Sequence, residues 1–111
     1  MNYADKLTNI STKMREVFIS DTVMNKVSDL RIYLIEELKL SQEAAHKRID
    51  RIDRFLSSLS GAVDYPLCHF KKWCKLGYRC AVFEKNWVFA YEIFEGGIII
   101  RDMSHTSLLA E

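Results

Sequence analysis

Cationic side chains gather in the last third of this chain, where they could bind a polyanion. Between residues 67 and 85 the sequence has five Lys or Arg against one acid. Guanidinium and ammonium groups bind phosphates, and a histidine exchanges a proton near neutral pH. The cations of this segment, with two more side chains near the C-terminal end, are Lys71, Lys72, Lys75, Arg79, Lys85, Arg101 and His105. The pattern predicts a basic surface on a small sheet.

Four runs rich in β-branched and aromatic residues should form that sheet. They cover residues 67–75, 78–84, 87–94 and 98–103, and turn signals separate them at Lys75-Leu76-Gly77, Lys85-Asn86 and Glu95-Gly96-Gly97. Connections this short predict antiparallel neighbours. Pro66 stands at the entry to the first run, where it costs no ladder hydrogen bond.

The first half of the chain predicts one strand and two helices. A strand is expected over residues 14–20, and Ser20 can then cap a helix whose apolar residues are Val23, Val27, Leu30, Leu34 and Leu38. Ser41 can cap a second helix that ends near Gly61 and buries Ala45, Ile49, Ile52, Leu56 and Leu59. The short connection makes the two helices an antiparallel hairpin.

The predicted fold class is therefore α+β: an N-terminal strand and an antiparallel helical hairpin packed on a three- to four-stranded antiparallel sheet. A chain of 111 residues with 49% hydrophobic residues fits one domain, over residues 14–111, preceded by a polar, weakly patterned extension over residues 1–13. The net charge of +1 argues against nucleic-acid binding by bulk electrostatics. Any anion site must come from local clustering.

Location and redox state follow from what the sequence lacks. It has no run of 18 apolar residues and no signal-peptide pattern, so we expect a cytoplasmic protein that does not enter a membrane. Cys68, Cys74 and Cys80 match no zinc spacing, which predicts reduced thiols and no metal or other cofactor.

A resemblance to a known family rests on this order of elements and on a set of spaced residues. The spaced residues are Gly77-Tyr78-Arg79, Trp87-Val88-Phe89-Ala90-Tyr91, Ile98-Ile99-Ile100-Arg101 and His105-Thr106-Ser107. Together they resemble the RelE/ParE toxin superfamily of bacterial type II toxin–antitoxin systems, over about residues 14–107. The resemblance implies a cognate antitoxin as partner. It also implies one of two activities, ribosome-dependent mRNA cleavage or poisoning of DNA gyrase without cleavage.

For the nuclease branch, the resemblance assigns roles to particular side chains. Arg79 and Arg101 would stabilise the phosphate, and His105 would act as general acid or base without a metal. The resemblance also places Lys71 and Lys72 near basic residues of that branch. The local clustering of charge, apart from the resemblance, adds Lys75 and Lys85 as nucleic-acid contacts, with Trp73, the one aromatic whose cationic flanks suit a nucleic-acid or partner surface. Phe83, Trp87, Phe89 and Tyr91 are better explained as core.

Two features favour other activities. After His105 the chain has no aromatic or basic residue where the nuclease branch often has one. Arg101 and His105 share a face only if the strand continues regularly between them. Cleavage of ribosome-bound mRNA is the leading hypothesis, gyrase inhibition is the alternative, and a non-enzymatic binding module with the same fold is the third.

Overall fold

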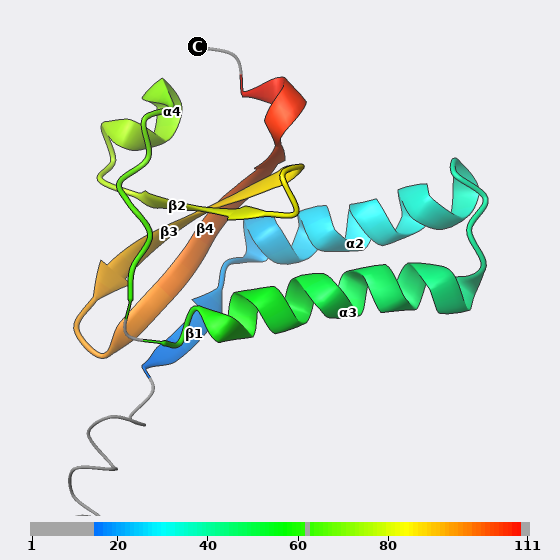
Figure 1. The fold of residues 1–111 in the computed structure, drawn as a ribbon, viewed down its shortest axis with the longest axis horizontal. Helices are drawn as coiled ribbons and strands as arrows, with labels where there is room; N and C mark the ends of the chain where they lie inside the picture. Colours follow the sequence, from blue (N-terminus) through cyan, green and yellow to red (C-terminus); the bar gives the residue numbers. More distant parts are fainter. Residues whose placement is uncertain (1–14, 62, 110–111) are drawn as a thin grey trace, which may run out of the picture.

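A helical hairpin and a four-stranded sheet make up the fold, and the hairpin extends past the edge of the sheet (Figure 1). The computed structural model describes residues 15–61 and 63–109. The elements in chain order are β1 (Glu16–Ile19), α2 (Asp21–Glu36), α3 (Gln42–Ser58), α4 (Lys71–Cys74), β2 (Arg79–Phe83), β3 (Trp87–Phe94), β4 (Gly97–His105) and a 3-10 turn, η1 (Thr106–Leu108). The predicted α+β class is confirmed, and the predicted extension over residues 1–13 lies outside the described residues.

Both long helices begin at the serines that the sequence indicates. The Ser20 hydroxyl accepts a hydrogen bond from the Val23 N–H at 3.3 Å, and the Ser41 hydroxyl accepts one from the Ala44 N–H at 3.0 Å. Each bond satisfies one of the N–H groups that a helix leaves unpaired at its start. Lys39, in the connection, has a φ of 61°. This short connection turns α3 back antiparallel to α2, as predicted.

The sheet is mixed, so the prediction of an entirely antiparallel sheet is wrong at one strand. The strand order is β1-β4-β3-β2, in which β2, β3 and β4 are antiparallel neighbours and β1 runs parallel to β4. Short turns force the antiparallel pairs. The whole of α2, α3, β2 and β3 separates β1 from β4, and such a long crossover permits parallel pairing.

A β-bulge interrupts β4 in the middle of the sheet. Ala90 pairs with Asp102 and Tyr91 pairs with Ile100, which leaves Arg101 as the extra residue. A bulge breaks the strict alternation of faces. Arg101 and Asp102 consequently border the same hollow, although they are adjacent in sequence.

The first predicted strand of the basic segment, residues 67–75, is not a strand. Leu67 makes one isolated bridge to Arg79, and the chain then forms the short helix α4. The N–H groups of Trp73 and Cys74 both donate to the carbonyl of Phe70, and Gly77, with a φ of 76°, lets the chain turn into β2. The apolar spacing of Phe70 and Trp73 fits a helical turn better than a strand.

Cys68 and Cys80 form a disulfide, which corrects the prediction of reduced thiols. The Cys68 N–H donates to the Tyr78 carbonyl at 2.8 Å, and the Cys80 N–H donates to the Pro66 carbonyl at 3.2 Å. These bonds set the two cysteines side by side, with Cα atoms 4.9 Å apart. Cys74 remains a free, exposed thiol. The disulfide therefore closes the loop that carries α4.

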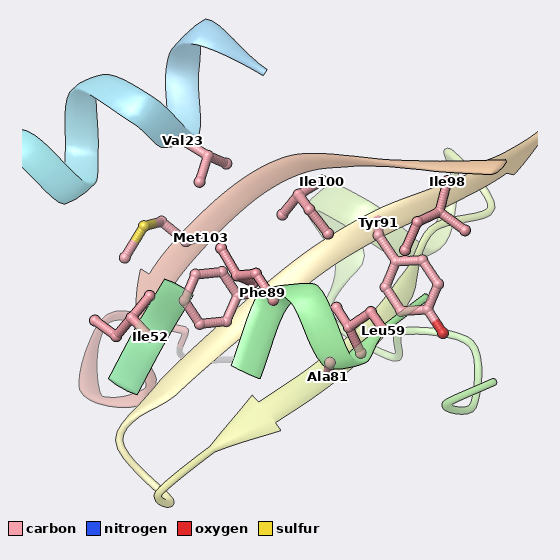
Figure 2. Packing of buried hydrophobic residues seen from close by; sticks show 10 residues of the cluster. Val23, Ile52, Leu59, Ala81, Phe89, Tyr91, Ile98, Ile100 and Met103 are labelled. Carbon is pink, nitrogen blue, oxygen red and sulfur yellow. The ribbon is translucent and has the colours of Figure 1, made fainter. Parts of the chain in front are cut away.

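Two apolar clusters lie on opposite faces of the sheet. The larger one joins the hairpin to the sheet, and Figure 2 shows Phe89, Ile100 and Met103 of the sheet beside Val23 of α2 and Ile52 of α3. The smaller cluster puts Trp73 of α4 and the disulfide against Val88 and Ala90. Phe89 and Tyr91 are fully buried, while Phe83 and Trp87 pack against the larger cluster. The prediction that these four aromatics are core is confirmed.

The close approach of β1 to β4 gives a test of the fold. A methyl group at Gly97 would lie 2.5 Å from the Glu16 carbonyl oxygen, a backbone atom that cannot rotate away. We expect Gly97→Ala to lower the free energy of unfolding by about 1–3 kcal/mol in urea denaturation. Gly61→Ala is the matched control, because its methyl would meet only ordinary contact at 3.5 Å from the Ser58 carbonyl oxygen. Equal urea midpoints for the two variants would contradict the parallel pairing.

Candidate functional site

A cleft of about 730 Å³ lies between the hairpin and the end of the sheet that carries His105. Residues of α2 form one wall, and the β2–β3 turn, the end of β4 and η1 form the other. Its apolar lining includes Leu30, Leu34, Leu38, Trp87, Met103 and Leu108. Its polar lining includes Lys26, Asp29, Tyr33, Arg48, Asn86, Ser104, His105 and Ser107. This combination of an apolar lining with two cations and a histidine makes the cleft the candidate site.

His105 is held in a fixed orientation at the N-terminal end of η1. Its ring lies edge-on to Trp87, its cross-strand partner, with the ring centroids 5.2 Å apart. The Ser107 N–H donates to Nδ1 at 3.2 Å, and the Ser107 hydroxyl lies 2.8 Å from the same nitrogen. Because Nδ1 accepts the backbone N–H, the neutral imidazole carries its hydrogen on Nε2. His105 thus caps a turn and also presents a hydrogen-bond donor.

Lys26 links the cleft to the opposite face of the sheet through Asp102. Lys26 Nζ lies 2.7 Å from Asp102 Oδ1 and donates to the Met103 carbonyl at 3.1 Å. Trp73 Nε1 donates to Asp102 Oδ2 at 3.3 Å. Burial alone would raise the pKa of Asp102, but the hydrogen bonds from Lys26 and the Met103 N–H outweigh it and hold the pKa below its usual range. The positive charge of Lys26 is therefore largely neutralised by Asp102.

Arg48 is the cation of the cleft that no carboxylate neutralises. It is exposed on α3, and none of the ion pairs among residues 15–61 and 63–109 includes it. Arg51, one turn further along, forms two hydrogen bonds with Glu84 in the β2–β3 turn, at 3.1 and 3.2 Å. This pair ties the hairpin to a turn in which Glu84 and Lys85 both have positive φ. Arg48 and Nε2 of His105 are the groups of the cleft best suited to a carboxylate or a phosphate.

Arg79, predicted to stabilise a phosphate, lies beside a structural network. Its Nη1 donates to the Tyr65 carbonyl at 2.7 Å. The neighbouring Asp64 is bound by both guanidinium nitrogens of Arg15 and by the Tyr91 hydroxyl, whose oxygen lies at the edge of the core in Figure 2. The Arg15 hydrogen bonds hold the pKa of Asp64 below its usual range, and burial raises the pKa of Tyr91. This network closes the loop between α3 and β2.

Arg101 and Lys72 meet on the other face of the sheet from the hairpin. They border a hollow of about 370 Å³ with Trp73 and Tyr78. Arg101 Nε donates to Glu92 at 2.8 Å, and Lys72 Nζ lies 5.0 Å from the centre of the Trp73 ring. Trp73 is only 2% exposed. The prediction of an exposed Trp73 on which bases could stack is therefore wrong.

The structure does not bring the predicted site residues to one place. His105 lies in the cleft on β4, Arg79 lies two strands away on β2 and four residues further along the sheet, and Arg101 lies on the opposite face. Lys71 and Lys72 belong to α4, Lys75 follows it, and Lys85 lies in the β2–β3 turn. The basic segment is thus distributed over two faces and a turn. The bulge at Arg101 is the reason that it and His105 do not share a face.

Sequence reasoning missed the cleft residues contributed by the hairpin. Lys26, Asp29 and Tyr33 follow one another at steps of three and four on α2, which places them on one face beside the apolar stripe. That spacing is a signal that the sequence offered. Arg48 had no such signal, because it belongs to a run of alternating charges typical of a solvated face.

Comparison of the chain with protein-family models, with curated proteins and with solved structures gives no match in any of the three. Within the described residues, no helix has the length and apolar character needed to cross a membrane. Residues 15–61 and 63–109 also contain no group of three or more His, Cys, Asp or Glu side chains arranged to hold a metal ion. The site is therefore interpreted from its own geometry.

The Asp64 network predicts a specific dependence of stability on pH. Because the folded-state pKa of Asp64 is depressed, its contribution is fully present above the unfolded pKa of about 3.9 and is lost as pH falls through the folded pKa. We expect Asp64→Asn to lower the free energy of unfolding at pH 7 by about 1–3 kcal/mol. Below about pH 4, the free energy of unfolding of Asp64→Asn should approach that of wild type.

Asp50→Asn is the control for this measurement. Asp50 pairs with Arg54, whose side chain is 81% exposed, so removing its charge should change stability by less than about 0.5 kcal/mol at any pH. Urea denaturation from pH 2 to 7 measures both. If the free energy of unfolding depended on pH in the same way in wild type and in Asp64→Asn, the Asp64 carboxylate would not be part of this network.

Proposed function

We propose that this chain is the toxin of a bacterial type II toxin–antitoxin pair, and that it acts by binding a protein target rather than by cleaving RNA. The order of the described elements supports the family, because the resemblance to the RelE/ParE superfamily implies a strand, two helices and then three strands. The proposed mechanism, binding without RNA cleavage, is inferred from the separation of Arg79, Arg101 and His105. Three groups that act on one phosphate must lie within hydrogen-bond reach of it, and these do not.

The surface around the cleft suits a protein partner. Beyond the sheet, the far end of the hairpin exposes Ile32, Tyr33 and Leu38, each about half accessible, beside the mixed lining of the cleft. An apolar patch with an aromatic residue and an arginine is the usual composition of a protein interface. Of the two activities that the resemblance implies, poisoning of DNA gyrase is the one that needs such an interface and no catalytic residues.

RNA cleavage stays the second candidate, because of one specific feature. The cleft holds His105 with a hydrogen on Nε2, together with Arg48, Lys26 and Tyr33. These groups include an acid–base residue and a phosphate-binding cation, which a metal-free ribonuclease needs. A nuclease built on this fold would therefore use the cleft and His105, with ribosome-bound mRNA as the substrate, and would not use Arg79 or Arg101.

A cognate antitoxin is the second partner in this proposal. An antitoxin segment that folds on binding would cover the exposed apolar side chains of the hairpin and the cations of the cleft. Arg48 favours a segment with carboxylates, since no acid of the described residues pairs with it. Co-expression with the products of the adjacent genes would identify this partner.

Inducing the chain in a bacterial host tests the proposal. We expect growth arrest with a DNA-damage response and no new 5′ ends on a translated message. Arg48→Ala should weaken binding to purified gyrase by about tenfold and relieve the arrest. Arg54→Ala is the matched control, because Arg54 lies on the same helix, is 81% exposed and lies outside the cleft lining.

The other outcomes are equally informative. New 5′ ends that depend on translation and disappear in His105→Gln would establish the nuclease. Growth that continues normally on induction, with no adjacent gene product bound, would reject the toxin assignment. Equal loss of toxicity in Arg48→Ala and Arg54→Ala would show that the cleft is not the binding surface.

A further inference from the structure

A loop closed by the disulfide covers part of the sheet face that lies opposite the hairpin. It begins at Cys68, ends at Cys80 and carries α4 between them. Trp73 of α4 is only 2% exposed and belongs to the smaller apolar cluster, together with Val88 of β3. We call residues 68–80 the disulfide loop.

The local contacts of the disulfide loop are weak by themselves. The helix α4 has four residues, and Phe70 at its N-cap makes no side-chain hydrogen bond to it. A helix this short is unstable without outside support. At the base of the loop, the Cys68 N–H donates to the Tyr78 carbonyl at 2.8 Å. The Cys80 N–H donates to the Pro66 carbonyl at 3.2 Å, so the disulfide reinforces a base that two backbone hydrogen bonds also hold.

Reduction of the disulfide would favour a detached state of this loop. A cross-link stabilises a folded segment by limiting the conformations that the unfolded segment can reach. With the bond intact, the ends of the loop stay together, and α4 has few arrangements away from the sheet. With two thiols in its place, the ends can separate, and the entropy of the detached loop rises. The burial of Trp73 therefore depends on the oxidation state of Cys68 and Cys80.

Trp73 connects the disulfide loop to the cleft through Asp102. Its indole Nε1 donates to Asp102 Oδ2 at 3.3 Å. The other oxygen of this carboxylate, Oδ1, lies 2.7 Å from Lys26 Nζ and accepts from the Met103 N–H at 2.8 Å. Lys26 lines the cleft, whereas Trp73 and Asp102 border the hollow on the other face of the sheet. One carboxylate thus has a contact on each side of the sheet.

Loss of Trp73 from the sheet would weaken the ion pair between Lys26 and Asp102. Once the indole is removed, water reaches Oδ2, and opposite charges attract each other less in the higher dielectric of water. The Lys26 ammonium then becomes available to an anionic group in the cleft, which Arg48 also lines. Reduction of the disulfide would thus add a second available cation to the site.

We propose that the Cys68–Cys80 disulfide is a redox switch for the cleft, in which reduction releases α4 from the sheet, separates Trp73 from Asp102 and frees the charge of Lys26. The switch acts on the cleft itself, and it does not depend on whether the cleft binds a protein or RNA. The reductant is a dithiol.

The exchange with a dithiol proceeds in two steps. A thiolate of the reagent attacks one cysteine sulfur and forms a mixed disulfide, and the other cysteine leaves as a thiolate that takes up a proton. The second thiol of the reagent then displaces the remaining cysteine, which leaves two thiols in the chain and one disulfide in the reagent. Because Cys68 and Cys80 are 3% and 9% exposed, the first attack requires a transient opening of the loop.

Treatment of the full chain with dithiothreitol tests this proposal. Before reduction, only the Cys74 thiol should react with iodoacetamide, and after reduction all three cysteines should react, because the detached loop exposes them. Reduction should lower Tm by about 8 °C or more. In NMR spectra it should shift the amide signals of α4 and of Met103, and the ammonium protons of Lys26 should exchange with water faster.

Two variants separate the switch from a purely structural disulfide. In Trp73→Phe, which lacks the indole N–H, reduction should still expose the cysteines but should not change the Lys26 ammonium exchange further, because the contact to Asp102 is already absent. Cys74→Ser is the matched control, because it removes a cysteine of the same loop and leaves the disulfide in place. Reduction should affect Lys26 in Cys74→Ser as it does in wild type.

Three results would overturn the proposal. Three cysteines that react with iodoacetamide before reduction would show that the disulfide does not form. Lys26 and Met103 signals that stay unchanged when the wild-type chain is reduced would show that the disulfide loop is not coupled to the cleft. An equal change at Lys26 in wild type and in Trp73→Phe would show that the coupling does not pass through the indole.

Discussion

The parallel pairing of β1 with β4 determines where every other part of this molecule lies. The Glu16 N–H donates to the Gly96 carbonyl, and the Ser20 N–H donates to the Ile100 carbonyl at 3.0 Å. Ser20 also caps α2 and donates from its hydroxyl to the Arg101 carbonyl at 3.1 Å. One residue therefore ends a strand, begins a helix and contacts the bulge of the central strand. Because α2 starts at this point, the hairpin leaves the sheet in a fixed direction and creates the cleft against the end of β4.

The bulge in β4 then decides which chemistry is possible on this sheet. In a regular strand Arg101 and His105, four positions apart, would point to the same side. The extra residue sends Arg101 toward Trp73 and Glu92, while His105 stays with Trp87 beside the hairpin. The same irregularity brings Asp102 within reach of both Trp73 and Lys26, so it joins the smaller cluster to α2. The bulge that lets Asp102 reach Trp73 and Lys26 therefore also separates Arg101 from His105, and chemistry at a single phosphate would need these two side chains together.

Local patterns predicted most of the fold, and long-range pairing accounts for the errors. The helix starts at Ser20 and Ser41 follow from capping chemistry, and the span of β3 follows from its β-branched and aromatic residues and from the turn signals on either side. The parallel partner of β1 depends on a crossover of more than 70 residues, which no local pattern encodes. The Cys68–Cys80 pair depends on backbone hydrogen bonds between Pro66, Cys68 and the start of β2. The burial of Trp73 follows from the same loop, because α4 folds onto the sheet once the disulfide closes it.

The candidate site was predicted less well than the fold, for a related reason. A composition argument can find the cations of residues 67–85, but the faces on which they lie depend on whether that segment is a strand. Once residues 71–74 form a helix, Lys71 and Lys72 move to the side of the smaller cluster, and Arg79 alone of these cations remains on the side of the hairpin, engaged with Tyr65. The cleft obtains its cation, unpaired among the described residues, from α3 instead, because Arg48 is among the residues that line it, as is His105. The geometry of the cleft therefore depends on how the hairpin is held over the sheet, and the Arg51–Glu84 and Lys26–Asp102 pairs add to the apolar cluster that joins the two.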